Sequence, residues 1–284
     1  MTTIATTSAG DTTITSDPGR TAVQDWFTDV HAITMRNLTR LKRSPDVVGF
    51  ALLQPIMFVL LFSQVYGGAI RVEGSNYTEF LMAGIFAQTV IFGSTISGSY
   101  MAEDIRDGII DRFRSLPMAP SAVLVARSVS DFILNIVSIT VMIITGFLVG
   151  WRFREGVLDF VLGLVLLLVF AWAFSWVMIF IGLSVKSPET LNQAVFIILF
   201  PLTFISNAFV PSDTLPTVLR VFAEWNPVSA LVQAVRTLFG NLGDMPAPSV
   251  WPMQHPIPTV LVGILMVLLV FPPLAVRKFR RKQV

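Results

Sequence analysis

Six long apolar stretches, separated by short polar segments, dominate the pattern of the chain. They cover about residues 47–65, 80–100, 122–149, 157–185, 191–210 and 257–276. An apolar stretch of about 18 residues or more with few charges is typical of a helix that crosses a bilayer. The pattern therefore predicts an all-α polytopic membrane protein with six transmembrane helices, in one domain over residues 45–284.

The composition supports a membrane protein. A soluble globular domain carries about 25% charged residues, whereas only 13% of these 284 residues are charged and 54% are hydrophobic. The mean hydropathy is +0.71. The chain contains no cysteine, which excludes disulfides and cysteine-ligated metal or iron–sulfur sites.

The positions of lysine and arginine predict the orientation, because cytoplasmic loops carry an excess of them. If both termini are cytoplasmic, only five of the 20 cations lie outside: Arg71, Arg152, Arg154, Arg220 and Arg236. The basic sequence RKFRRKQV at 277–284 then lies inside. We therefore expect a multi-pass protein of the bacterial plasma membrane with both termini cytoplasmic. The Thr/Ser-rich residues 1–21 are expected to form a disordered cytoplasmic tail.

Two further segments are apolar enough to touch a membrane without crossing it. Residues 22–44 are expected to form an amphipathic helix on the inner leaflet. Its apolar positions at helical spacing are Val23, Trp26, Phe27, Val30, Ile33 and Leu41. The alternative is a helix of the same pattern packed on a partner domain. Residues 211–240 carry charges and prolines, and are expected to form two short outer helices, broken at WNP, that enter the membrane and return.

The densest charge lies between the second and third apolar stretches. Seven of the twelve residues in 103–114 are charged: Glu103, Asp104, Arg106, Asp107, Asp111, Arg112 and Arg114. Ile105, Ile109, Phe113 and Leu116 recur at spacings of 4, 4 and 3, which predicts one helix over about residues 103–116. Such a helix would dock into a cytosolic partner and pass motion to the spans that it joins. The alternative is a loop whose charges only solvate the membrane face.

Polar residues inside the apolar stretches are candidates for a substrate path, because they are costly in lipid. We expect such a path to include Gln88, Asn135 and Asn207 together with Phe86, Phe92 and Trp176. The alternative for each amide is a hydrogen bond between helices. Arg127 and Asp131 lie four residues apart and are expected to form an ion pair.

The sequence FGSTISGSY at 92–100 places small residues four apart, as Gly93 with Ser97 and Ser94 with Gly98. This spacing predicts two membrane helices in close contact. A serine nucleophile assisted by His255 is the alternative, but one Ser-Gly pair gives it almost no support. The predicted function is therefore not enzymatic.

The sequences LPMAPSAVLVARSVSD at 116–131 and NPVSALVQAVR at 226–236, with the six apolar stretches, resemble permeases of type-2 ABC exporters. The chain is most similar to the daunorubicin-resistance permease group of actinobacteria. The resemblance implies a permease that pairs with a second permease, identical or related, and with two copies of an ATP-binding subunit. It also implies that residues 103–116 form the coupling helix seated on that ATPase.

The missing motifs fit this division of labour. No G-x-x-x-x-G-K-[ST] sequence occurs, so no phosphate-binding loop is expected. We therefore expect no cofactor on this chain, with ATP and magnesium bound by the partner. Membrane lipids and a hydrophobic or amphiphilic substrate, drug-like or lipid-like, are the other expected partners, and nucleic acid is not. The alternative functions are a stand-alone secondary carrier or channel and a structural scaffold.

Overall fold

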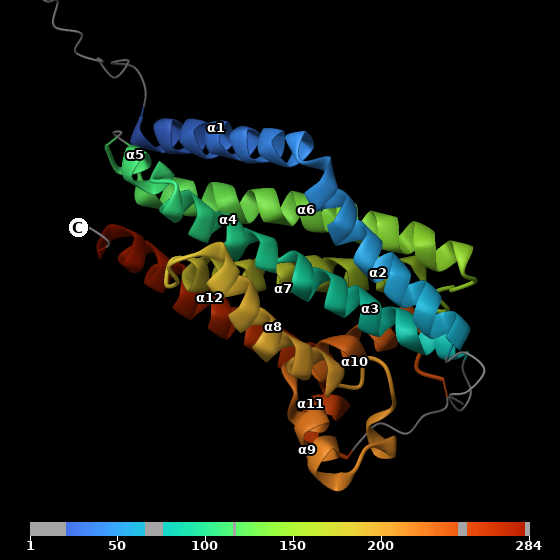
Figure 1. Ribbon diagram of the computed structural model, residues 1–284. Helices are drawn as coiled ribbons and strands as arrows, with labels where there is room; N and C mark the ends of the chain where they lie inside the picture. The colour runs from blue at the N-terminus through green and yellow to red at the C-terminus, as the bar shows by residue number, and fades with distance from the viewer. Residues whose placement is uncertain (1–20, 66–75, 116–117, 244–248, 282–284) are drawn as a thin grey trace, which may run out of the picture.

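The computed structural model describes residues 21–65, 76–115, 118–243 and 249–281 (Figure 1). Helices, joined by turns and short irregular segments, make up these residues, with no strand among them. The predicted disordered tail lies outside the described residues except for Thr21, and so does Leu116 of the predicted coupling helix. The all-α prediction is confirmed for the part of the chain that the structure describes.

Each of the six predicted spans contains one helix, except the second, which contains α3 and α4. These helices are α2 (Pro45–Val65), α3 (Tyr77–Gly93), α4 (Thr95–Arg106), α6 (Pro120–Leu148), α7 (Val157–Gly182), α8 (Pro188–Phe204) and α12 (Pro256–Arg281). Among the described residues, four stretches are long and apolar enough to cross a membrane: Tyr77–Arg106, which joins α3 to α4, and α6, α7 and α12. The chain is thus an integral multi-pass membrane protein. Crossing by the shorter apolar parts of α2 and α8 stays a prediction.

The predicted end of the fifth span is wrong. Helix α8 ends at Phe204 rather than near residue 210, and Pro201 lies inside its last turn. The chain then bends into a short 3-10 helix, η1 (Ser212–Thr214), and two helices, α9 (Thr217–Trp225) and α10 (Pro227–Phe239). These two helices are separated at Asn226, as the WNP sequence predicts. Helix α10 packs against α3, α7 and α12, while their entry into an outer leaflet stays a prediction.

Helix α7 holds the bundle together, because it contacts α12, α4, α6 and α10. Helices α4 and α7 approach each other closely. A Cβ atom at Gly98 would lie 2.7 Å from the carbonyl oxygen of Met178, and one at Gly182 would collide with the carbonyl oxygen of Gly98. Ser94 Oγ also donates a hydrogen bond of 3.2 Å to the carbonyl oxygen of Ala171. The predicted close contact through small residues is confirmed for Ser94 and Gly98.

Helix α1 (Ala22–Arg43) lies beside the first part of α6 (Figure 1). Trp26 Nε1 donates a hydrogen bond of 3.1 Å to Ser121 Oγ, and Asn37 Nδ2 donates one of 3.2 Å to Ser130 Oγ. Phe27, by contrast, is 62% exposed. The predicted helix is confirmed, and one of its faces packs on this chain's own bundle. Its position on the inner leaflet stays a prediction.

Candidate functional site

The predicted coupling helix is two helices rather than one. Helix α4 ends at Arg106, and α5 (Ile109–Ser115) begins after Gly108. Gly108 has φ of +68°, a left-handed conformation that glycine adopts without steric cost. The break turns α5 so that Ile110, 3% exposed, enters the core in place of Ile109. The single helix over residues 103–116 is therefore wrong, while its role in docking stays a prediction.

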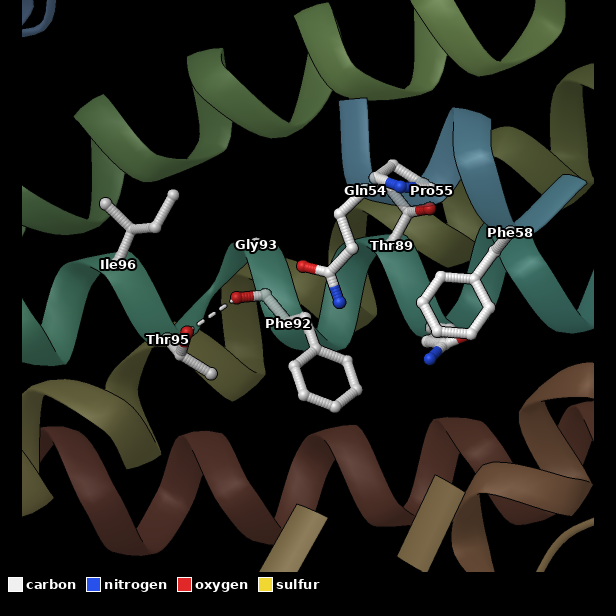
Figure 2. Close-up of a pocket in the computed structure, with 9 residues that line it drawn as sticks. Gln54, Pro55, Phe58, Thr89, Phe92, Gly93, Thr95 and Ile96 are labelled. Carbon is white, nitrogen blue, oxygen red and sulfur yellow. Dashed lines mark hydrogen bonds between the residues drawn. The ribbon is translucent and has the colours of Figure 1, made fainter. Parts of the chain in front are cut away.

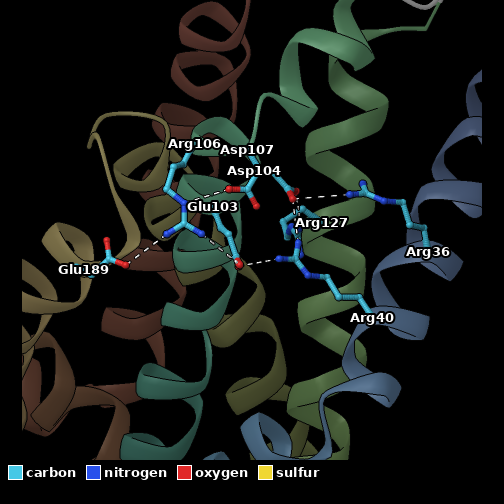
Figure 3. Close-up of polar contacts among 8 residues, drawn as sticks. All are labelled: Arg36, Arg40, Glu103, Asp104, Arg106, Asp107, Arg127 and Glu189. Atoms are coloured by element: carbon cyan, nitrogen blue, oxygen red, sulfur yellow. Dashed lines mark hydrogen bonds and ion pairs between the residues drawn. The ribbon is translucent and has the colours of Figure 1, made fainter.

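Charged side chains from four helices meet where α4 ends, and we call them the ionic cluster (Figure 3). Its members are Arg36 and Arg40 of α1, Glu103, Asp104, Arg106 and Asp107 at the end of α4, Arg127 of α6 and Glu189 of α8. Four arginines thus face four carboxylates, so the cluster is balanced in charge. It ties the amphipathic helix α1 to three helices of the bundle.

Asp104 lies at the buried centre of the ionic cluster and is only 3% exposed. Its carboxylate lies 2.7 Å from Arg127 Nη2, 2.9 Å from Arg40 Nη1 and 3.7 Å from Arg36 Nη2. A buried carboxylate is tolerated when it is paired in this way. Asp104 therefore joins helices within the chain, and its burial does not fit the predicted contact with an ATPase.

The predicted ion pair between Arg127 and Asp131 is wrong. Arg127 pairs with Asp104 of α4 instead. Asp131 accepts a hydrogen bond of 3.3 Å from Asn135 Nδ2 one turn further along α6. The spacing along α6 is correct, but packing against α4 supplies Arg127 with a different carboxylate.

The outer part of the ionic cluster is open to solvent. The Arg106 guanidinium lies 3.1 Å from Asp107 and 3.4 Å from Glu189, and these three side chains are 45%, 42% and 68% exposed. Glu189 precedes the predicted fifth span. Hydrogen bonds from its own backbone N–H and from Ser187, followed by the nearby charge of Arg106, hold the pKa of Glu189 below its ordinary value.

Helix α5 extends this charged surface beyond the cluster. Asp111 and Arg112 are exposed, while Ile110 and Phe113 face the core. The guanidinium of Arg36 lies 5.1 Å from the centre of the Phe113 ring, which ties α5 to α1. Arg114 belongs to α5, but its side chain lies outside the described part of the structure. Two of the charges predicted for a docking helix, Asp111 and Arg112, are thus exposed on a short, anchored element.

A cavity of about 170 Å³ lies between α2 and the α3–α4 junction (Figure 2). Its walls are formed by Gln54, Pro55, Phe58, Gln88, Thr89, Phe92, Gly93, Thr95 and Ile96. Gln88 is 6% exposed, and its Oε1 has no hydrogen-bond partner among the described residues. The cavity therefore combines largely apolar walls with a buried amide whose acceptor has no partner among the described residues.

Two residues of the predicted substrate path, Gln88 and Phe92, line this cavity. The other four belong to contacts between helices. Phe86 packs against Trp151 and Phe239, and Trp176 lies in the core near α5. Asn135 donates a hydrogen bond to the carbonyl oxygen of Asp131, and Asn207 donates one to Gln233 Oε1. The alternative interpretation, a hydrogen bond between separate segments of the bundle, is thus observed for Asn207, whereas Asn135 bonds within its own helix α6.

The predicted substrate path did not include Gln54 and Phe58, which also line the cavity. The missed signal is a repeated pattern, because Gln54 precedes Phe58 by four residues and Gln88 precedes Phe92 by four. Residues four apart lie on one face of a helix, so each pattern places an amide beside a ring. Rings continue from the cavity along α2 and α8 in an aromatic series formed by Phe58, Phe62, Phe209, Phe204 and Phe200.

The NPVSALVQAVR sequence closes the break after α8. Asn226 Nδ2 donates hydrogen bonds of 2.6 and 3.0 Å to the carbonyl oxygens of Leu202 and Ile205. Its Oδ1 accepts a hydrogen bond of 2.9 Å from the backbone N–H of Val228, which begins α10. One side chain thus satisfies both the end of α8 and the start of α10.

Arg236 completes this closure without a carboxylate. It is 1% exposed. Its Nε donates a hydrogen bond of 2.9 Å to the carbonyl oxygen of Phe80, and its Nη2 donates one of 2.7 Å to that of Asn207. The guanidinium also lies 3.5 Å from the centre of the Phe80 ring. Arg236 therefore fixes the irregular segment after α8 against α3.

The long apolar helices, the cavity between them and the charged end of α4 characterise a multi-pass membrane protein. Residues 28–239 match the family described as ABC-2 type transporter, and the chain belongs to that family. It is accordingly the membrane subunit of an ABC transporter. Both sequence stretches that carried the resemblance lie inside the matched region.

Curated relatives support this assignment. The chain is 30% identical over 247 residues to the daunorubicin resistance ABC transporter permease protein DrrB1 of Streptomyces coeruleorubidus, covering 87% of this chain and 84% of that protein. It is 26% identical over 213 residues to the doxorubicin resistance ABC transporter permease protein DrrB of Mycobacterium tuberculosis, covering 75% and 74%. A putative transport permease, ycf38, of Cyanophora paradoxa is 23% identical over 220 residues, covering 75% and 74%.

Proposed function

We propose that this chain is the permease subunit of an exporter that moves hydrophobic or amphiphilic, drug-like or lipid-like molecules out across the bacterial plasma membrane. Two copies of a separate ATP-binding subunit bind ATP and magnesium and supply the energy. A second permease, identical or related, completes the transport path. Both termini of this chain are cytoplasmic in the proposal, so α5 faces the ATP-binding subunits.

The observation that carries the proposal is the construction of α5. This helix of seven residues is set apart from α4 by Gly108, and it exposes Asp111 and Arg112 beyond Arg106 and Asp107. Its other face is anchored by Ile110, which is 3% exposed. A charged surface with an apolar anchor suits an element that receives a push from a partner and does not detach.

The ionic cluster supports the transmission of such a push. Asp104, one turn before the break, is paired with α1 through Arg40 and with α6 through Arg127. Buried charge pairs resist separation, because removing either partner strands the other in a medium of low polarity. A displacement of α5 would therefore be shared by α1, α4 and α6.

The small volume of the cavity supports a transport path that is completed by a second permease. Pockets that enclose drug-sized molecules measure about 300–1,000 Å³, whereas this cavity measures about 170 Å³. Its apolar walls suit a hydrophobic cargo, and the free acceptor of Gln88 suits a cargo that carries a hydroxyl or amine. The printed names of two relatives, which refer to daunorubicin and doxorubicin, favour cargo of this amphiphilic class.

The test is to purify the tagged chain from membranes of its host, with its ATPase partner, and to measure ATP hydrolysis with and without daunorubicin. Asp107→Arg combined with Arg112→Glu should abolish association with the ATPase while the permease remains inserted. Asp213→Arg, an exposed charge reversal on the predicted outer side, is the matched control and should leave association unchanged. Gln88→Leu should keep association and lose the stimulation by daunorubicin.

Two results would overturn the proposal. One is normal ATPase association of the Asp107 and Arg112 double variant, which would remove α5 from the coupling surface. The other is transport of daunorubicin into vesicles by the purified chain without any ATP-binding subunit, which would establish a stand-alone carrier.

A further inference from the structure

An apolar groove lies at the bend where α1 meets α2, beside α6 (Figure 1 shows the bend). The groove measures about 410 Å³ and is lined by Leu38, Leu41, Lys42, Pro45, Gly49, Leu52, Ile133, Leu134 and Val137. Lys42 is the only charged residue in this lining. The groove is separate from the cavity between α2 and α3, because the two share no lining residue.

The cations of α1 divide into two groups. Arg36 and Arg40 belong to the ionic cluster, where carboxylates neutralise them. Lys42 and Arg43, in the last turn of the same helix, are exposed and have no ion pair within the described part of the chain. Lys42, which lines the groove, therefore places a positive charge without an ion pair among the described residues directly beside an apolar surface, and Arg43 follows it in the chain.

We propose that this groove binds one acyl chain of an anionic phospholipid, with the phosphate of the headgroup held by Lys42 and Arg43. The acyl chain packs against the apolar walls of the groove. The two cations favour a negatively charged headgroup over a zwitterionic one. Basic residues beside a membrane-facing helix attract anionic lipids in this way. The lipid stays bound at the bend between α1 and α2 and is not the transported cargo, so this inference goes beyond the proposed function.

Gly49 gives a direct way to fill the groove. Gly49 lines the groove, and a Cβ atom built there meets no other atom within 4 Å, so we expect a larger side chain at this position to fill part of the groove. Glycine is also a poorer helix former than leucine, so Gly49→Leu does not weaken α2. Gly263 of α12 is a matched control, because a Cβ atom there also meets nothing within 4 Å and Gly263 does not line the groove.

The experiment is native mass spectrometry of the purified full chain in detergent, titrated with phosphatidylglycerol or phosphatidylcholine. The wild type should retain one phosphatidylglycerol more tightly than phosphatidylcholine. Gly49→Leu should lose this bound lipid, and Gly263→Leu should keep it. Lys42→Gln should weaken retention of phosphatidylglycerol about fivefold, as expected for one cation beside an anionic lipid, while Lys186→Gln, another exposed and unpaired cation, should not.

Several outcomes would overturn the proposal. Equal lipid retention by the wild type and Gly49→Leu would place the lipid elsewhere, and equal loss in Gly263→Leu would make the binding nonspecific. Equal retention of the two lipids by the wild type would remove the role of charge. A change of Gly49→Leu from dimer to monomer, visible in the same spectra, would assign the groove to a second copy of the chain. None of these measurements needs ATP or cargo, so they stand apart from the test of export.

Discussion

Two buried arginines, one at each irregular region of the bundle, are stabilised in different ways. Arg127, 5% exposed, lies 2.7 Å from the carboxylate of Asp104 at the charged end of α4. Arg236, 1% exposed, donates its hydrogen bonds to backbone carbonyl oxygens beside the break after α8. The ion pair joins side chains of two helices, so α4 and α6 are expected to move together. Arg236 instead binds backbone carbonyl oxygens and fixes the shape of one irregular segment. The first contact couples helices to one another, and the second holds a break in place.

The strongest test of this difference is Arg236→Met, which keeps an apolar stem of similar length and removes the guanidinium. The carbonyl groups of Phe80 and Asn207 would lose their donors in a buried site, at about 1–3 kcal/mol each. We expect a loss of about 4 kcal/mol of stability, measured as a large drop in the unfolding temperature in detergent. Arg277→Met, at an exposed position, is the control. An unchanged melting temperature for Arg236→Met would show that the break holds without it.

The next effect in size is expected at the ionic cluster. Asp104→Asn would leave Arg127 buried without a negative partner and should cost about 3 kcal/mol. Combining Asp104→Leu with Arg127→Met should cost less than Asp104→Asn alone, because neither charge is then stranded. Thermal unfolding of the single and double variants measures this coupling. Additive losses would show that the pair makes no joint contribution.

The smallest effect is expected at the exposed edge of the same cluster. Glu189→Gln removes the 3.4 Å contact with Arg106, but both side chains are open to solvent, where ion pairs contribute little to stability. We expect an unchanged melting temperature in this variant. A clear decrease in the melting temperature would show that Glu189 of α8 also contributes to the stability of the cluster. The distinction between a stabilising buried centre and an exposed edge would then be wrong.

The sequence predicts the helices of this fold well, because an apolar stretch must form a helix in lipid. It predicts the breaks poorly. The spacing of Ile105, Ile109 and Phe113 fits one helix, and nothing in that spacing shows that Gly108 adopts a positive φ. The end of α8 near Phe204 is equally hidden, because the apolar residues continue past it.

Contacts between residues that are far apart in the sequence are the second feature that the sequence predicts poorly. The spacing of Arg127 and Asp131 shows a possible contact within α6, but Asp104 reaches Arg127 only through the packing of α4. The acceptors of Arg236 are carbonyl groups of residues 80 and 207, which every residue carries and no residue type reveals. The cavity residues could have been predicted from the sequence, because Gln54 with Phe58 and Gln88 with Phe92 share a spacing of four residues.

The contact between Gly98 and Gly182 has a mechanical consequence. Backbone lies against backbone at that point, so we expect α4 to tilt about the contact rather than to slide along α7. Gly98 lies between α5 on one side and the cavity residues Gln88 to Ile96 on the other. A tilt of this kind would move the end of α4 next to α5 and the end next to the cavity in opposite directions.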